Sequence, residues 1–321
     1  MSTQSNTATP PGTRGEMFTL SALADTFMAC YQGRDPSFTS RLSFFTQHLG
    51  EKVASEIDAD DIDDVLEALK QRGRLFNVGG NKRGGSVIST HKTLADATIN
   101  RYRCTLQSVL TWARKRRLMP KTWVNPVVET QRLPEDNART RYLSEPEYEK
   151  LIKVSRLASW NKLTLLIMLA VTTGARRGTL LGLRWKDVDL NSGRAFCERT
   201  KNGDPFVLVL MPDVIQEFQR ISTKTNPEDL VFCGRYPTKP MNFNKPWEQA
   251  LKDAQIEGVV FHSLRHTHAS WLAKRGAPLL AIADSLGHKS LAMTKRYAHL
   301  CVDSRAEMLK RVFNPGVNNH E

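Results

Sequence analysis

A polar stretch at residues 129–141 divides this chain of 321 residues into two segments. It contains a proline and few apolar residues, which is typical of a linker between domains. Each flanking segment is long enough to bury a hydrophobic core of its own. The sequence therefore predicts two domains, at 17–128 and 142–315, with a disordered tail at 1–16 and a short tail at 316–321.

The chain is strongly basic, with 46 lysines and arginines against 33 aspartates and glutamates. This balance indicates a polyanionic partner, with nucleic acid favoured over a membrane surface. No run approaches the roughly 18 apolar residues of a membrane span. The five cysteines are odd in number and far apart, which suggests neither a disulfide framework nor a metal site. We expect a protein of a reducing cytoplasm.

Carboxylates gather in residues 51–67, at Glu56, Asp58, Asp60, Asp61, Asp63 and Asp64. One interpretation is a calcium or magnesium site, because carboxylates two and three residues apart can ligate such ions. The other is the start of a helix, since acidic side chains favour the positive end of the helix dipole and apolar residues follow at helical spacing. The stretch lacks the glycine of an EF-hand loop, which favours the helix.

Residues 70–121 are basic, and Asp96 is their only acidic residue. Thr93 and Asp96 resemble a capping box at the start of a long helix with an apolar face. The polar remainder of that helix is largely arginine, and such an excess of one charge repels itself unless an anion opposes it. We predict that this helix and the preceding loop bind the DNA backbone through Lys82, Arg83, Arg101, Arg103, Arg114 and Lys115.

The second segment mixes helices with one hairpin. Ser144 is placed to cap its first helix, and an apolar helix follows at 161–172. Two β-rich pieces at 195–200 and 206–210 flank Asn202-Gly203, a hairpin signal that places Lys201 at the mouth of the turn. Further helices are expected at 263–275, at 279–286 before a Gly287 cap, beyond Ser290, and at 302–313.

Polar residues in this second segment form a set suited to cleaving a phosphodiester with a side chain. A tyrosine supplies the nucleophile and cations hold the phosphate. The set comprises Arg176, Lys201, His262, Arg265, His288 and Tyr297. Taken singly, the tyrosine would most often be a half-buried aromatic and the cations surface charges. A zinc site from His262, His266 and His268 is disfavoured, because no glutamate follows His262 as in His-Glu-x-x-His and no cysteine lies nearby.

The order and spacing of these residues resemble the tyrosine recombinases of the phage-integrase group. The match covers residues 140–300 and consists of Thr173-Gly174-Ala175-Arg176, Lys201, His262-x-x-Arg265-His266, Leu286-Gly287-His288 and Tyr297. The resemblance implies a mainly α fold with a small β-sheet, arranged as a two-domain DNA clamp. In such a clamp, a helical N-terminal core-binding domain faces a mixed α/β catalytic domain.

The resemblance also implies residue roles. Arg176 and Arg265 would clamp the phosphate, and Tyr297 would form a 3′-phosphotyrosyl link without ATP, metal or other cofactor. His262 would help to move the tyrosine proton, His288 would donate a hydrogen bond to a phosphate oxygen, and Lys201 would protonate the departing 5′ oxygen. Lys186 is a weaker competitor for the lysine role, because it precedes the hairpin.

One position departs from the family pattern. Three residues after its first arginine the family commonly has an acidic residue, and Thr179 stands there in this chain. A hydroxyl can donate or accept a hydrogen bond but carries no charge, so the sequence leaves open what supports Arg176.

The sequence thus predicts a site-specific DNA recombinase, the integrase of a prophage or other mobile element. Its expected partners are double-stranded DNA, further copies of the chain in a homotetramer, and accessory DNA-bending or directionality proteins, in the cytoplasm at the bacterial nucleoid. Dimer resolution, inversion or relaxation of DNA are alternative tasks for the same chemistry. A non-cleaving DNA-binding protein of this fold is the alternative from another class. The 302–313 helix would pack either on a neighbouring subunit or on its own domain.

Overall fold

The computed structural model describes residues 17–33, 35–78, 86–89, 92–135, 141–197, 206–222 and 226–313. The chain forms two compact units, Met1–Asn137 and Ala138–Glu321. Their boundary lies inside the stretch 129–141, but the first part of that stretch packs on the first unit. Asn100 Nδ2 donates to the Leu133 carbonyl at 2.9 Å, and Leu133 N donates back to Asn100 Oδ1 at 3.0 Å.

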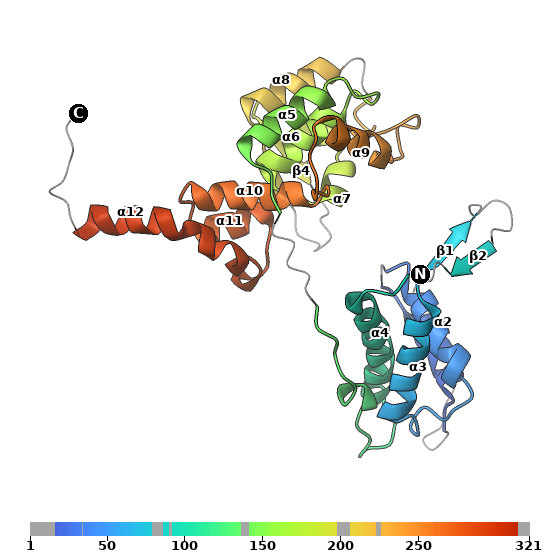
Figure 1. Ribbon diagram of the computed structural model, residues 1–321. Coiled ribbons are helices and arrows are strands. Elements are labelled where there is room, and N and C mark those ends of the chain that lie inside the picture. The colour runs from blue at the N-terminus through green and yellow to red at the C-terminus, as the bar shows by residue number, and fades with distance from the viewer. Residues whose placement is uncertain are drawn as a thin grey trace, which may run out of the picture. The chain divides into compact units, whose positions relative to one another are not determined.

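The first unit is a helical bundle with one β-hairpin (Figure 1). Helix α4 packs against α1, α2 and α3 and carries much of the core, through Ile99, Leu106, Val109 and Leu110. Its elements are α1 (Leu20–Cys30), α2 (Phe38–Leu49), α3 (Ala59–Arg72), β1 (Leu75–Val78), β2 (Ser86–Ser89), α4 (Asp96–Lys115) and the short helix η1 (Pro126–Val128).

Of two helix starts expected in this unit, the structure confirms one and contradicts the other. The acidic stretch does begin a helix, because Asp58 and Asp61 form a reciprocal capping box at the start of α3. The capping box expected at Thr93 is wrong. Helix α4 begins at Asp96 with Ala95 as its N-cap, so Thr93 stands too far from the first turn to accept its N–H groups.

The second unit is larger and also mainly helical. Its elements are α5 (Glu145–Ser155), α6 (Leu163–Thr173), α7 (Arg177–Leu181), η2 (Trp185–Asp187), β3 (Val188–Asp189), β4 (Arg194–Cys197), β5 (Phe206–Val209), α8 (Pro212–Ile221), α9 (Asn244–Asp253), α10 (Ser263–Lys274), α11 (Leu279–Leu286), η3 (Leu291–Met293), η4 (Lys295–Cys301) and α12 (Val302–Phe313).

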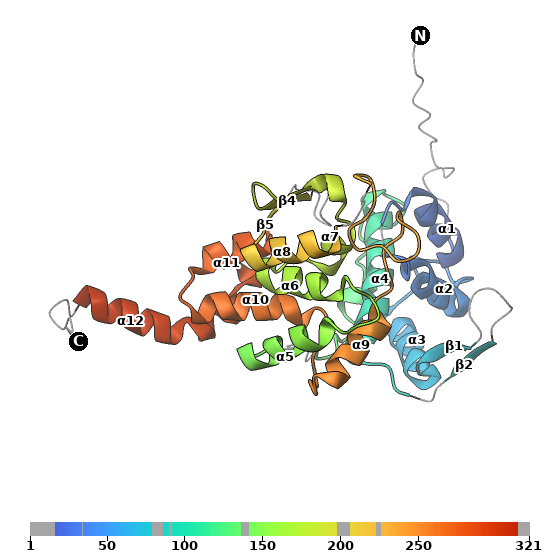
Figure 2. The ribbon, with the colours of Figure 1, turned by 90° about the horizontal axis from the view of Figure 1, so that it is seen from above.

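Helix α6 is the centre of this unit and is buried along almost its whole length. It packs against α5, α8 and α10, and Figure 2 shows it between α8 and α10. A helix that is apolar almost all round has no polar face for water, so other elements must cover it on nearly every side. The start of the unit is fixed to α10, since Leu143 N donates to Thr267 Oγ1 and Trp271 Nε1 donates to the Leu143 carbonyl.

A small antiparallel sheet of order β3-β4-β5 completes the unit. Ala195 and Cys197 of β4 face the core, whereas Phe196, paired with Val207 of β5, faces outward. The fold class expected from the sequence, mainly α with a small sheet, is confirmed. Helix α12 extends away from the rest of its unit in both views (Figures 1 and 2).

Candidate active site

The C-terminal ends of two helices hold the Arg265 guanidinium in place. Helices α6 and α11 both end at a left-handed glycine, Gly174 with φ 63° and Gly287 with φ 60°. The Gly174 and Leu286 carbonyls accept hydrogen bonds from the Arg265 guanidinium, both at 2.7 Å. Carbonyls at a helix C-terminus carry partial negative charge and stabilise a cation there. Only 6% of Arg265 is exposed, so this buried guanidinium is held by backbone.

Arg176 lies beside the same helix ends. It follows Gly174 by two residues as the N-cap of α7, and its Nη2 donates to the Gly287 carbonyl at 3.5 Å. Burial, and then the nearby Arg176 charge, lower the pKa of Arg265 to about 10. None of the ion pairs found in the described ranges involves Arg176 or Arg265. The site therefore brings two positive charges together, and a bound anion would balance them.

Two histidines flank these arginines. His262 is the N-cap residue of α10, and partial burial, followed by the charge of Arg265, lowers its pKa. His288 follows the Gly287 cap, and its Nδ1 is hydrogen-bonded to Thr294 Oγ1 at 2.8 Å. Burial and the charge of Arg265 lower the pKa of His288 to about 4. Its ring is therefore neutral at pH 7.

Tyr297 lies on η4 with 6% of its surface exposed. Its ring belongs to an apolar cluster from α10 and α11, formed by Ala269, Ala273, Ile282 and Leu286. Burial raises the pKa of the phenol, although Arg296 and Arg265 partly oppose that rise. The hydroxyl is hydrogen-bonded to His266 Nδ1 at 2.6 Å.

The partner of Tyr297 differs from the one that the sequence suggested. The family pattern gave the tyrosine proton to His262, whereas the residue that touches the hydroxyl is His266, one turn further along α10. The two histidine rings are 5.1 Å apart and perpendicular. The spacing of four residues puts both rings on one helix face, so the sequence places His266 beside His262 without showing which of the two the tyrosine contacts.

Lys201 lies outside the described residues. The strand that follows it does reach the site, because the Phe206 ring of β5 lies about 3.6 Å from where a Cβ on Gly287 would stand. The competing lysine, Lys186, is ion-paired with Glu228 at 3.0 Å. Thr179, at the departure from the family pattern, is half-buried on α7, and its backbone N–H donates to the Arg176 carbonyl.

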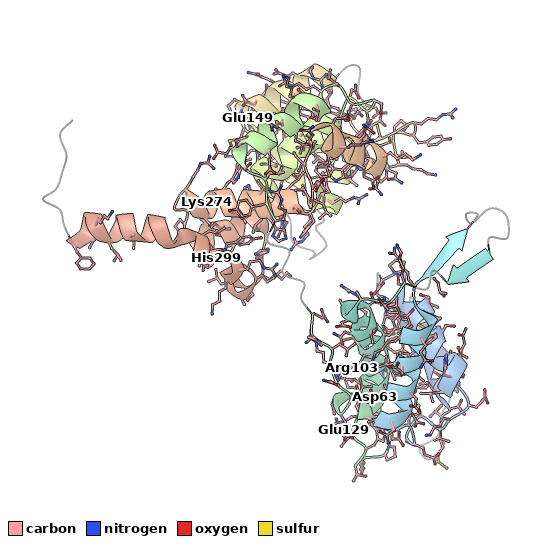
Figure 3. The ribbon with its side chains drawn as sticks, in the orientation of Figure 1. Asp63, Arg103, Glu129, Glu149, Lys274 and His299 are labelled. Carbon is pink, nitrogen blue, oxygen red and sulfur yellow. The ribbon has the colours of Figure 1, made fainter. Side chains whose placement is uncertain are left out.

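The DNA-contact residues expected in the first unit divide into three groups. Arg101, Arg114 and Lys115 are exposed on α4, and Lys82 and Arg83 lie outside the described residues. Arg103, labelled in Figure 3, is 9% exposed and donates to Thr130 Oγ1 and to the Val127 and Thr130 carbonyls. Its guanidinium ties α4 to the segment after η1, so we remove Arg103 from the predicted DNA contacts.

The histidines do not form a zinc site of the kind weighed from the sequence. His268 points away from the other two: its Nδ1 is bonded to the Val171 carbonyl and its Nε2 to Ser285 Oγ. In the part of the chain that the structure describes, no three His, Cys, Asp or Glu side chains are placed to hold a metal ion. Within the same ranges, no helix combines the length and the hydropathy needed to cross a bilayer.

The sequence profile of the phage integrase family matches residues 141–303, just over half of the chain. The chain belongs to this family, and its class is that of the tyrosine site-specific recombinases. The resemblance noted from the sequence is confirmed.

Individual relatives agree with this assignment. The chain is 26% identical over 305 residues to the integrase of Salmonella phage P22, covering 87% of this chain and 76% of that protein. It is 31% identical over 179 residues to the shufflon-specific DNA recombinase of Escherichia coli, covering 55% of this chain and 44% of that protein. The Tn1549 transposon integrase, solved with a circular intermediate DNA, has the same fold with a TM-score of 0.68 at 18% identity, covering 92% of this chain and 99% of that one.

Proposed function

We propose that this recombinase is the integrase of a prophage or other mobile element and that it cleaves DNA through Tyr297. The observation that carries the proposal is the meeting of Arg176, Arg265 and Tyr297, which come from three segments, at the ends of α6 and α11. Two fixed guanidinium groups beside a phenol suit a phosphodiester, because guanidinium binds phosphate oxygens bidentately and stays charged.

The proposed step is a direct displacement at phosphorus. The Tyr297 oxygen forms a bond to phosphorus while the bond to the 5′ oxygen breaks, leaving a 3′-phosphotyrosyl link and a free 5′ hydroxyl. Arg176 and Arg265 stabilise the negative charge that grows on the non-bridging oxygens, and His288 donates a hydrogen bond to one of them. The link keeps the energy of the broken bond, so rejoining needs neither ATP nor a metal.

Lys201 is proposed as the acid that protonates the departing 5′ oxygen. The position of Phe206 beside Gly287 supports this role, because β5 begins five residues after Lys201 and adjoins the arginine-holding helix end. A general acid typically contributes about 10²–10⁴ in rate. Loss of this lysine would therefore slow cleavage and leave binding intact.

We propose that residues 17–128 form a core-type DNA-binding domain and that residues 142–315 form the catalytic domain, which together clamp the duplex. Arg101, Arg114 and Lys115 on the exposed side of α4 support the first part, since such cations bind by releasing counterions from the phosphate backbone. The formal net charge of +13 supports the same partner.

We propose a homotetramer assembled on two duplexes. Helix α12 supports this assembly, because it extends from its unit and exposes Met308, Leu309, Val312 and Phe313. Apolar side chains gathered on one projecting helix are typical of a surface that another chain covers. The proposed setting is the bacterial nucleoid, where accessory DNA-bending or directionality proteins would set the direction of exchange.

Covalent trapping tests the chemistry. Full-length protein and its Tyr297→Phe variant are incubated without metal on nicked suicide duplexes that carry candidate attachment sites from the flanks of the gene. A denaturant-resistant adduct that requires Tyr297 is expected, since the short 5′-hydroxyl strand diffuses away. Binding to a demonstrated cognate site without an adduct would instead favour a non-cleaving DNA-binding protein.

DNA inversion is the second candidate task. The similarity to the shufflon-specific recombinase favours it, but that match covers 55% of this chain, whereas the match to the phage integrase covers 87%. Plasmids with two cognate sites separate these tasks. Joining of sites on two molecules supports integration, and a preference for inverted sites on one molecule supports inversion.

A further inference from the structure

The contact between His266 and Tyr297 is short and well fixed on both sides. The 2.6 Å separation of Nδ1 and the phenol oxygen is that of a strong hydrogen bond. Helix α10 carries His266, and η4, which packs directly on α10, carries Tyr297. None of the hydrogen bonds found in the described ranges joins Tyr297 to His262, the residue to which the family pattern gave the proton.

The protonation states of the two groups define the direction of this hydrogen bond. Burial first, then the charges of His262, Arg296 and Arg265, lower the pKa of His266 to about 4. Burial raises the pKa of Tyr297. At neutral pH the imidazole is therefore uncharged and carries one N–H, while the phenol keeps its proton.

The surroundings of the phenol select the tautomer of the imidazole. If Nδ1 carried the histidine proton, the phenol proton would need a different acceptor. His266 Nδ1 is the one hydrogen-bond partner of the hydroxyl found in the described ranges, and the side chains that cluster with Tyr297 are apolar and offer no acceptor: Ala269, Ala273, Ile282 and Leu286. A buried donor without an acceptor is destabilising. The favoured arrangement has Tyr297 donating to an unprotonated Nδ1, with the histidine proton on Nε2.

We propose that His266 is the base that takes the proton of the Tyr297 hydroxyl as this oxygen attacks the scissile phosphorus. The O–H bond of the phenol breaks and an N–H bond forms at Nδ1, which makes the ring an imidazolium. The Oη–P bond forms and the P–O5′ bond breaks. On rejoining, His266 returns its proton to the tyrosine. This role rests on the proposed function of Tyr297 as nucleophile.

Binding of the phosphate strengthens this base. The charged and titratable groups that act on His266 are His262 and Arg265 of α10 and Arg296 of η4, and each disfavours the imidazolium. Arg176 of α7 and His288, which lies beyond α11, belong to the same cluster. A phosphate anion bound by the arginines offsets their charge, so the basicity of His266 increases when the substrate arrives. The free protein keeps the proton on Tyr297, and the complex can move it.

A substrate with an altered leaving group distinguishes the role of the base from the role of the acid. When sulfur replaces the 5′-bridging oxygen, the departing thiolate needs no proton, so the substrate bypasses the acid but not the base. We expect His266→Gln to slow adduct formation about 100-fold or more on both the oxygen and the sulfur duplex, as loss of a general base typically does. Lys201→Ala should be slow on the oxygen duplex and largely restored on the sulfur duplex.

The matched control is His299→Gln, which removes an exposed histidine of the same η4 helix (Figure 3). It should cleave both duplexes at the wild-type rate. Wild-type cleavage by His266→Gln, or its rescue by sulfur, overturns the inference while leaving the proposed function standing. Failure of the wild type to form a Tyr297-dependent adduct on a cognate site overturns both.

A spectroscopic readout on the free protein needs no DNA, and its first measurement needs no variant. The ring ¹⁵N signals of His266 in the full-length wild type should show a neutral ring with an unprotonated Nδ1 at pH 7. The Nδ1 signal should shift when Tyr297→Phe removes the donor. A protonated Nδ1 overturns the inference, because that nitrogen then has no lone pair for the tyrosine proton.

Discussion

At the scale of single residues, Arg265 combines a structural and a chemical function in one side chain. Its guanidinium donates to the Gly174 and Leu286 carbonyls and is buried with its charge. Three donors on one ammonium group cannot reproduce two parallel planar N–H groups. We expect Arg265→Lys to lower the rate of adduct formation about 10²–10³-fold, the range for loss of one oxyanion donor. Single-turnover cleavage of the suicide duplex measures this rate.

The control for that prediction is Arg177→Lys. Arg177 is the exposed neighbour of Arg176, with its guanidinium over the Phe243 ring, and it lies outside the proposed phosphate clamp. It should cleave at close to the wild-type rate. Close to wild-type cleavage by Arg265→Lys as well would mean that the cations act through general attraction of DNA and that Arg265 has no special position, because lysine keeps the charge.

Thr179 tests what replaces the acidic residue of the family pattern. Backbone carbonyls at the ends of α6 and α11 hold both arginines. The arginines therefore do not depend on an acidic side chain at position 179, and the Thr179 hydroxyl is not needed to replace one. We expect Thr179→Ala to change the cleavage rate and the stability by no more than about 0.5 kcal/mol, as substitutions away from such contacts do. A tenfold slower cleavage with an unchanged melting temperature would show that the hydroxyl positions Arg176.

The residue pattern indicated the candidate site residues better than the contacts that hold them in place. The order Arg176, His262, Arg265, His288 and Tyr297 was readable because these side chains recur at fixed spacings. The contact of His266 was not, since helical periodicity places it beside His262 but does not say which face η4 covers. Arg103 was readable in principle, because it continues the spacing of Ile99, Leu106 and Leu110 on the buried side of α4.

At the scale of secondary-structure elements, the two left-handed glycines differ in how closely their neighbours pack. A Cβ on Gly174 would lie 2.6 Å from the buried His268 ring and 2.8 Å from Leu286, whereas a Cβ on Gly287 would meet Phe206 at an ordinary 3.6 Å. Gly287→Ala should therefore cost about 1–2 kcal/mol from the backbone conformation alone. Gly174→Ala should cost more, because α6 and α11 must separate. Urea unfolding of the two variants measures the difference.

The same two variants connect the helix ends to activity. Because the displaced carbonyls hold both arginines, Gly174→Ala should also reduce cleavage more than Gly287→Ala at a temperature where both are folded. A result in which Gly287→Ala is the more destabilised variant would contradict this account of packing at the helix ends.

Element boundaries were predictable where one strong local signal acts alone. Ser144 caps α5 through a reciprocal contact with Glu147, and Gly287 ends α11, both as the sequence indicated. The start of α4 was not, because the helix begins after Ala95, which offers no side-chain cap, and the resemblance of Thr93 to a capping residue was misleading. The packing of α6 between α8 and α10 depends on the whole unit, so no local pattern contains it.

At the scale of the whole molecule, two half-buried histidines make stability depend on pH. The pKa values of His266 and His288 are lowered to about 4 in the folded state from an ordinary 6.5. Between these pH values the unfolded chain binds protons that the folded chain does not. The free energy of unfolding therefore falls as the pH drops from 6.5 to 4, and above pH 6.5 these two groups add no further pH dependence. Urea unfolding at several pH values should show this slope, and a His266→Gln, His288→Gln double variant should flatten it. An unchanged slope would mean that other groups carry the dependence.

The exposed apolar residues at the end of α12 need another surface to cover them. Val312 and Phe313 are 61% and 74% exposed at its end. If a neighbouring copy covers them on DNA, Val312→Ser with Phe313→Ser should leave single-site binding and unfolding unchanged but reduce paired-site complexes in sedimentation. Leu157→Ser is the control, since Leu157 is 87% exposed on the same unit and lies outside α12. A lower unfolding free energy with intact pairing would instead mean that α12 packs on its own domain in solution. Strand exchange, which needs two paired sites, should fall with pairing, while adduct formation at one site persists.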